Sequence, residues 1–197
     1  MGRSEGFTKF IFPKFKELFP EQLEGVDADM FYRAVNKAQP SLIRTEADEL
    51  TYSLHIMVRY ELEKRIIAGD LAVKDSPAEW NRLYKEYLGI DVPSDKEGCL
   101  QDSHWSGGSF GYFPSYSLGS AYGTQMLAAM RKTVDVDGAL AKGDIAPITA
   151  WLKDRVHQHA SFLEPGDVVK SACEAEFDPT YYTNYLTEKF SKLYNLK

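Results

Sequence analysis

The amino-acid sequence predicts an all-α protein. Apolar residues recur at helical spacing over several long segments, helix start and stop signals bound these segments, and alternating strand-like patterns never exceed a few residues. With 197 residues, 44% of them hydrophobic, the chain is long enough to bury a sizeable core. It has no internal repeat and no low-complexity linker, so we expect one compact unit over residues 1–197.

The longest predicted helix is amphipathic and covers residues 46–68. Thr45 and Asp48 ahead of it have the spacing of a capping box, in which an acidic side chain satisfies a free backbone amide at the helix start. Gly69 then supplies a typical C-terminal stop.

The start of the next helix has the strongest local signal. Ser76 is a candidate N-cap, Pro77 suits the first turn, and Gly89 follows the last apolar residue. A final helix is expected to open at Asp178-Pro179. Shorter helices are expected at residues 5–18, 28–38, 117–132, 147–159 and 166–173.

Composition and charge exclude several classes of protein. The formal net charge is −6, which argues against a nucleic-acid binder because such proteins neutralise phosphates with clustered Lys and Arg. No secretory signal and no apolar stretch of about 20 residues is present, so no membrane partner is expected. Two cysteines, Cys99 and Cys173, make a weak disulfide framework. We therefore expect a cytoplasmic protein.

Residues 98–122 differ from the helical segments around them. They read GCLQDSHWSGGSFGYFPSYSLGSAY, in which glycines alternate with aromatic residues and His104. Glycine permits close backbone approach and aromatic rings form a partly apolar wall, so the composition suits a substrate pocket. Buried core packing explains the same composition and is favoured on composition alone. A phosphate cradle is disfavoured because GGSFG lacks the P-loop lysine.

Other polar residues give weak signals by themselves. His157 and His159 are two residues apart, which places them on nearly opposite sides of a helix and makes them a poor metal pair. Cys99, His104 and Cys173 match no zinc-binding spacing.

Three residues near the first long helix have ordinary structural explanations. Arg44, directly before the predicted cap, is most often a solvated arginine at a helix start. Asp48 is expected to be a cap, and His55, inside the helix, is expected to be structural or exposed.

Two motifs favour a functional role for Arg44 and for residues 98–122. Residues 43–48 read IRTEAD and residues 98–105 read GCLQDSHW. They resemble the (I/V)RxxAD and GxxQDxHW signatures of the thermostable carboxypeptidases of the Taq type, a family of zinc metallocarboxypeptidases. The resemblance extends over nearly the whole chain, with departures around Ala160 and at Cys173-Glu174-Ala175.

The resemblance also reveals an absence. Enzymes of this family resemble other zincins in taking two zinc ligands and the general base from an HExxH helix, and none of the four histidines here is followed by Glu. The family's third ligand, a glutamate, lies shortly before the stretch that is Gly2-Arg3-Ser4 in this sequence. We therefore expect the chain to begin just downstream of the metal site and to hold no zinc of its own.

The resemblance implies a role for each of two groups of residues. Arg44 would hold the C-terminal carboxylate of the substrate, and Gln101 and Asp102 would orient His104. His104 and Tyr116 would face the scissile carbonyl and stabilise the oxyanion, with Tyr112 as the second choice.

Two functions follow as expectations. In the first, the chain is the C-terminal segment of an enzyme that removes C-terminal amino acids from peptides, and is inactive alone. In the second, it is a non-catalytic peptide-binding or interaction module. The expected partners are peptide C-termini together with another copy of the chain or the missing N-terminal part, since the resemblance implies a homodimer.

Overall fold

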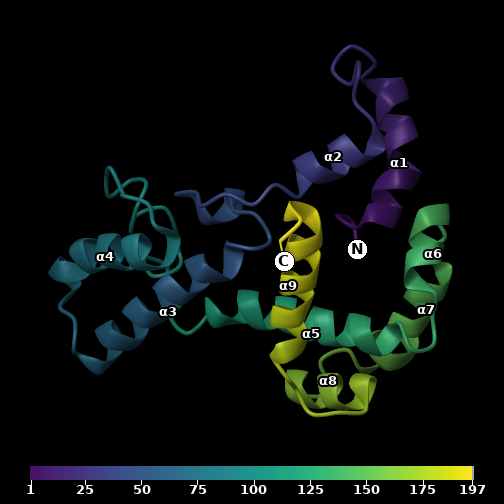
Figure 1. Cartoon of the computed structure of the whole chain (residues 1–197). Coiled ribbons are helices and arrows are strands. Elements are labelled where there is room, and N and C mark those ends of the chain that lie inside the picture. Colours follow the sequence, from purple (N-terminus) through teal and green to yellow (C-terminus); the bar gives the residue numbers. More distant parts are fainter. Residues whose placement is uncertain (197) are drawn as a thin grey trace. The chain divides into compact units, whose positions relative to one another are not determined.

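The computed structural model describes residues 1–196 and contains α-helices and short 3₁₀ helices, with no strand in that range (Figure 1). The predicted all-α fold class is confirmed. The chain divides into two compact units: unit 1 consists of Met1–Lys37 and Ala121–Lys197, and unit 2 of Ala38–Ser120. The expectation of one compact unit is therefore corrected, because the segment from Ala38 to Ser120 packs around a core of its own.

Unit 2 contains the two motifs of the sequence. Its elements are η1 (Arg44–Glu46), α3 (Tyr52–Ala68), η2 (Val73–Asp75), α4 (Ser76–Leu88) and the first residues of α5 (Pro114–Met130). The glycine- and aromatic-rich segment of residues 98–122 begins ten residues after the end of α4 and continues into α5.

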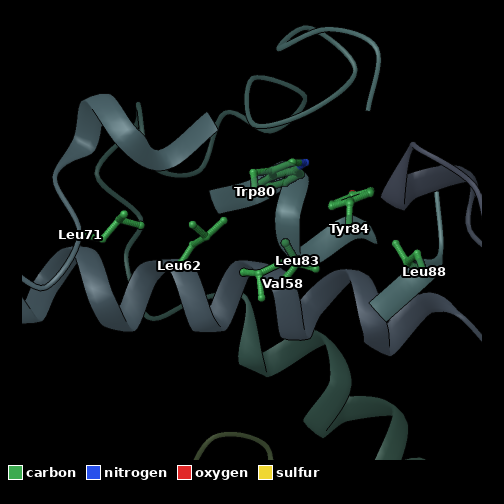
Figure 2. Packing of buried hydrophobic residues seen from close by; sticks show 7 residues of the cluster. All are labelled: Val58, Leu62, Leu71, Trp80, Leu83, Tyr84 and Leu88. Carbon is green, nitrogen blue, oxygen red and sulfur yellow. The ribbon is translucent and has the colours of Figure 1, made fainter. Parts of the chain in front are cut away.

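The core of unit 2 lies between α3 and α4. Figure 2 shows Val58 and Leu62 of α3 facing side chains of α4, among them Trp80 and Tyr84. Trp80 stacks on Tyr84 with ring centroids 5.0 Å apart. Each fully buried apolar side chain of this kind contributes about 1.5–3 kcal/mol, so this small core holds the two helices together.

Helix α3 starts six residues later than predicted. Asp48 does not complete a capping box with Thr45; its carboxylate instead accepts the backbone N–H groups of Leu50 and Thr51 and the hydroxyl of Thr51. This arrangement holds residues 49–51 in a turn, and the regular helix begins at Tyr52. The predicted stop is confirmed, because Gly69 takes the left-handed conformation with φ 81°.

Helix α4 has the predicted bounds, with one correction at its start. Pro77 lies in the first turn and Gly89 ends the helix at φ 73°. Ser76 lies inside the helix rather than at the N-cap, and its buried hydroxyl has no hydrogen-bond partner among residues 1–196. Proline at the first turn is sufficient to start the helix here because its fixed φ suits the helix and its missing N–H costs nothing.

Unit 1 contains the remaining helices. They are α1 (Glu5–Leu18), α2 (Ala28–Val35), the rest of α5, α6 (Val136–Lys142), α7 (Ala146–Arg155), η3 (His157–His159), α8 (Pro165–Cys173) and α9 (Thr180–Tyr194). The helices predicted at 28–38 and 147–159 are shorter than expected. Helix α6 was not predicted, because seven residues carry too little periodicity to detect.

The core of unit 1 gathers around α6. Its buried members are Met130, Val136, Ala139, Leu140 and Ile148. Gly6 allows α1 to lie directly against α6, since a Cβ at this position would stand 3.1 Å from the Asp137 carbonyl oxygen. No helix within residues 1–196 combines the length and the apolar character needed to cross a bilayer.

Candidate functional site

Arg44 is the central residue of the candidate site, and it is buried. Its exposed fraction is 7%. Its Nη2 donates to Asp102 Oδ1 over 2.8 Å and its Nε to the same oxygen over 3.3 Å. Its backbone N–H donates to Gln101 Oε1 over 3.0 Å. The base-rate expectation of a solvated arginine at a helix start is therefore wrong: both the side chain and the backbone of Arg44 are held by the second motif.

The guanidinium of Arg44 keeps hydrogen-bonding capacity for a ligand. Its Nη1 donates to the Tyr52 hydroxyl over 3.2 Å, and its central carbon lies 4.9 Å from the centroid of the Tyr116 ring. A guanidinium carries five N–H groups. The bonds to Asp102 and Tyr52 use one on Nε, one on Nη2 and one on Nη1, which leaves one N–H on each terminal nitrogen unused within the described chain. Two such groups are what a carboxylate requires for bidentate binding.

Asp102 holds two arginines rather than a histidine. Arg59 of α3 donates from Nε to Asp102 Oδ2 over 2.6 Å, while Arg44 occupies Oδ1. Burial raises the pKa of the Asp102 carboxyl, but the charge of Arg59 and the hydrogen bonds from both arginines outweigh this, and the pKa lies below its ordinary value. His104 Nδ1 is 3.9 Å from Oδ1, beyond hydrogen-bonding distance. The expectation that Asp102 orients His104 through a hydrogen bond is corrected.

Gln101 also serves Arg44. Its Oε1 accepts the Arg44 backbone N–H, and its Nε2 donates to the carbonyl oxygens of Leu42 and Glu97 over 3.1 and 3.2 Å. A side chain engaged at both ends of its amide is not available to the imidazole. The expectation that Gln101 orients His104 is therefore corrected; Gln101 fixes the backbone on either side of Ile43.

His104 and Tyr116 form a polar pair at the edge of the aromatic segment. His104 Nε2 and the Tyr116 hydroxyl are 3.1 Å apart. The imidazole packs against Phe113 with centroids 4.4 Å apart, and its buried Nδ1 has no hydrogen-bond partner among residues 1–196. Burial and the neighbouring Tyr112 raise the pKa of Tyr116, so its phenol carries a proton at neutral pH and can donate it in a hydrogen bond.

Tyr112 lies beside this pair and is half exposed. Its ring is 5.7 Å from that of His104 and 5.3 Å from that of Tyr116. The preceding residue, Gly111, has φ 75°, and its backbone N–H donates to the carboxylate of Glu63 in α3. Only glycine adopts this φ without strain, so the chain can turn here and present Tyr112 next to His104.

Sequence reasoning missed Arg59, which completes the site. The sequence carried one signal, because His55, Arg59 and Glu63 recur every four residues. In the structure all three lie along α3 and are buried. A stripe of ionisable residues beside the apolar stripe of a helix indicates a polar cluster inside the fold. His55 lies at one end of this stripe, where burial and the charge of Arg59 lower its pKa to about 4.

The residues present do not form a metal centre. Within residues 1–196 no group of three or more His, Cys, Asp or Glu side chains is arranged to hold a metal ion. His157 and His159 lie in η3, and Cys99 and Cys173, both free, belong to different units. The zinc implied by the resemblance therefore does not fit the side chains of this part of the chain.

The model of the carboxypeptidase Taq (M32) metallopeptidase family matches residues 1–190. The chain belongs to this family. The resemblance inferred from IRTEAD and GCLQDSHW is confirmed, and side chains of the two motifs are hydrogen-bonded to each other in unit 2.

Similar proteins place the chain within longer M32 carboxypeptidases. Carboxypeptidase 1 of Bacillus subtilis (strain 168) is 44% identical over 197 residues, which are 100% of this chain and 39% of the relative. Thermostable carboxypeptidase 1 of Thermus thermophilus is 38% identical over 98% of this chain and 38% of its own length. The crystal structure of the M32 carboxypeptidase from Deinococcus radiodurans R1 matches with a TM-score of 0.95 at 39% identity, covering 98% of this chain and 39% of the other. The chain thus spans about 39% of these relatives, in their C-terminal part.

Proposed function

We propose that this chain, over residues 1–197, is the C-terminal part of a metallocarboxypeptidase catalytic domain and recognises the substrate's free C-terminal carboxylate. The observation that carries the proposal is the state of Arg44: buried, held by Asp102 and Gln101, with one N–H unused on each terminal nitrogen. A planar guanidinium fixed in this way suits a carboxylate better than a flexible ammonium, because it donates two parallel hydrogen bonds.

The neighbouring pair of His104 and Tyr116 would act on the scissile carbonyl of the substrate. When His104 Nε2 carries the proton, it donates to the Tyr116 oxygen, and the phenol O–H of Tyr116 is free to donate to an oxyanion. A fixed donor aimed at developing negative charge lowers the barrier of acyl transfer. Tyr112, with its ring against both residues, is the second candidate for this role. Gln101 and Asp102 support substrate binding by fixing Arg44.

Residues outside this chain must then bind the metal, activate the water molecule and act as the general base. In the family as a whole we assign zinc to that role, and we expect the chain alone to bind none and to be inactive. The partner is accordingly the remaining part of the enzyme, together with peptide C-termini and a second copy of the chain. The two free thiols are consistent with a cytoplasmic location.

The proposal is tested by complementation. The part of the Bacillus subtilis relative that this chain does not cover is supplied as a separate polypeptide, and release of C-terminal amino acids from a peptide is measured. We expect metal-dependent activity in the mixture and none in either piece. A stable complex that remains inactive would contradict the proposal.

The same arginine site supports a second role. Arg44 and its partners are in place without any contribution from a metal ligand, so the chain could capture peptide C-termini as a non-catalytic module. An inactive complex, combined with measurable binding of free-carboxylate peptides by the chain alone, would favour this module over the enzyme segment.

A further inference from the structure

Arg59 is the most deeply buried charged side chain of unit 2, and the proposed chemistry does not use it directly. Its exposed fraction is 0%. Its Nη1 donates to the His55 carbonyl oxygen over 2.7 Å, and its central carbon lies 4.6 Å from the Trp80 ring centroid and 5.4 Å from that of Phe113. Removing a guanidinium from water is costly unless its partners compensate for the lost hydration. Such a residue therefore requires an explanation.

The principal partner of Arg59 is the carboxylate that holds Arg44. Nε of Arg59 donates to Asp102 Oδ2 over 2.6 Å, and Nη2 lies 2.5 Å from the same oxygen in ion-pair contact. Arg44 takes the other oxygen with both Nε and Nη2. Because each oxygen of Asp102 is bound to a different arginine, the carboxylate cannot rotate to give both oxygens to Arg44.

This division has two consequences for Arg44. Nε and Nη2 of Arg44 are bound to a single oxygen of Asp102, so the orientation of the guanidinium is fixed. One N–H on each terminal nitrogen stays unused among residues 1–196. Within the triad, two positive charges face one negative charge. An incoming carboxylate would balance the excess charge of the triad, in a place where few water molecules screen the attraction.

We propose that Arg59 is a positioning residue for the Arg44 carboxylate site, acting through Asp102. This inference rests on the proposed function, because it gives Arg59 a role in the binding of the substrate carboxylate. The competing explanation is that Arg59 only fills the core against Trp80. The two explanations differ in what happens to Arg44 when the charge at position 59 is removed but the packing is kept.

The experiment uses the whole chain and variants at this position. Arg59→Met keeps a long apolar stem and removes the charge, whereas Arg59→Lys keeps the charge but loses the planar fork. Arg65→Met is the matched control, since Arg65 lies on the same helix and pairs with Glu79 instead. Far-UV circular dichroism establishes that each variant is folded.

Two readouts are recorded. The first is the ¹H–¹⁵N resonance of the Arg44 Nε–H, assigned by its absence in Arg44→Lys, together with its rate of exchange with water. The second is the affinity for N-acetyl-alanine compared with N-acetyl-alaninamide, which lacks the free carboxylate. Arg59→Met should shift the Arg44 resonance, accelerate its exchange and weaken binding of the acid by about tenfold or more, as expected for a charge-assisted contact. Arg59→Lys should show smaller changes in the same direction, and Arg65→Met none.

Unchanged Arg44 exchange and affinity in a folded Arg59 variant would overturn the proposal and leave Arg59 as a core residue. If Arg59→Met does not fold, Arg59→Lys alone decides in the same way. A different result would contradict the proposed function: the wild-type chain would bind N-acetyl-alanine and N-acetyl-alaninamide equally. In that case the Arg44 resonance would still report whether Arg59 positions Arg44.

Discussion

The imidazole of His104 and the hydroxyl of Tyr116 lie 3.1 Å apart, the distance of a hydrogen bond. The two residues belong to different local structures: His104 begins a turn at residues 104–108 in the connection between α4 and α5, and Tyr116 lies in the first turn of α5. The pair therefore depends on the path of the glycine-rich segment between them. This path brings His104 next to the hydroxyl of Tyr116, and the Tyr116 ring centroid in turn lies 4.9 Å from the central carbon of the Arg44 guanidinium.

Tyr116→Phe should lower kcat in the reconstituted enzyme and leave KM nearly unchanged. The variant keeps the ring against Arg44 and removes only the O–H, whose hydrogen bond is used mainly in the transition state. Loss of one oxyanion donor costs about 100- to 1000-fold in kcat. Tyr112→Phe is the matched control and should have a much smaller effect. Steady-state kinetics of both variants make the comparison, and equal effects would show that the donor is misassigned.

His55 should make unit 2 less stable in mild acid. The unfolded chain takes up a proton near the ordinary His pKa of 6.5, whereas burial and the charge of Arg59 lower the pKa of folded His55 to about 4. Between these values the unfolded state binds more protons, so the free energy of unfolding falls as pH decreases, by about 2–3 kcal/mol at pH 4.

Urea unfolding at pH 7 and pH 4.5 measures this loss. In a Trp151→Phe background the tryptophan fluorescence comes from Trp80 and Trp105, both in unit 2. His55→Phe should show a smaller loss of stability between the two pH values than the parent, while the exposed His157→Gln should behave like the parent. An identical loss in the parent and in His55→Phe would exclude His55 as the group responsible.

Ala160→Gly should stabilise the chain. Ala160 has φ 47° and ψ −126°, a region that side-chain-bearing residues rarely occupy, and it lies where the sequence departs from the family pattern. Relief of this strain should raise the free energy of unfolding by about 1 kcal/mol. The matched control is Ala150→Gly on the exposed face of α7, where the same change should cost up to about 1 kcal/mol. Thermal unfolding compares the two, and destabilisation by both substitutions would contradict the strain argument.

The chain should self-associate in solution. Several large apolar side chains are exposed, including Phe162 at 94% in unit 1 and Val73 and Leu100 at 72% each in unit 2. Apolar surface of this kind favours association when its natural cover is absent. Sedimentation velocity should show a sedimentation coefficient that rises with protein concentration. A single monomeric species over a hundredfold range of concentration would contradict this expectation.

The sequence predicted elements well where the signal is local and poorly where it depends on distant partners. Pro77 and Gly89 defined α4 because proline and glycine impose their own backbone geometry. Asp48 was expected to start a helix at once, but its carboxylate closes a turn and delays α3. No local rule could have distinguished the two outcomes, because both use the same side chain to satisfy backbone amides.

The candidate site shows even more clearly that sequence patterns do not reveal contacts between distant residues. Arg44 and Asp102 are 58 residues apart, and no periodicity connects them. Family resemblance assigned both to substrate binding, and the structure shows them in contact. The hydrogen-bond partners of Asp102 are two arginines, however, and not the expected His104. Arg59 was missed because it lies in an ordinary helix outside both motifs. Its spacing from His55 and Glu63 was the single signal available.

The value of kcat/KM for Arg44 variants in the reconstituted enzyme tests most directly whether Arg44 binds the C-terminal carboxylate of the substrate. Arg44→Ala should lower kcat/KM for free-carboxylate peptides by roughly 30- to 1000-fold, the loss expected for a shielded bidentate contact. Arg44→Lys should recover only part of this, because an ammonium lacks the planar fork. Arg82→Ala, which removes an exposed arginine of α4, serves as the control and should leave kcat/KM unchanged. Near-normal kcat/KM in the Arg44→Ala complex would contradict the account.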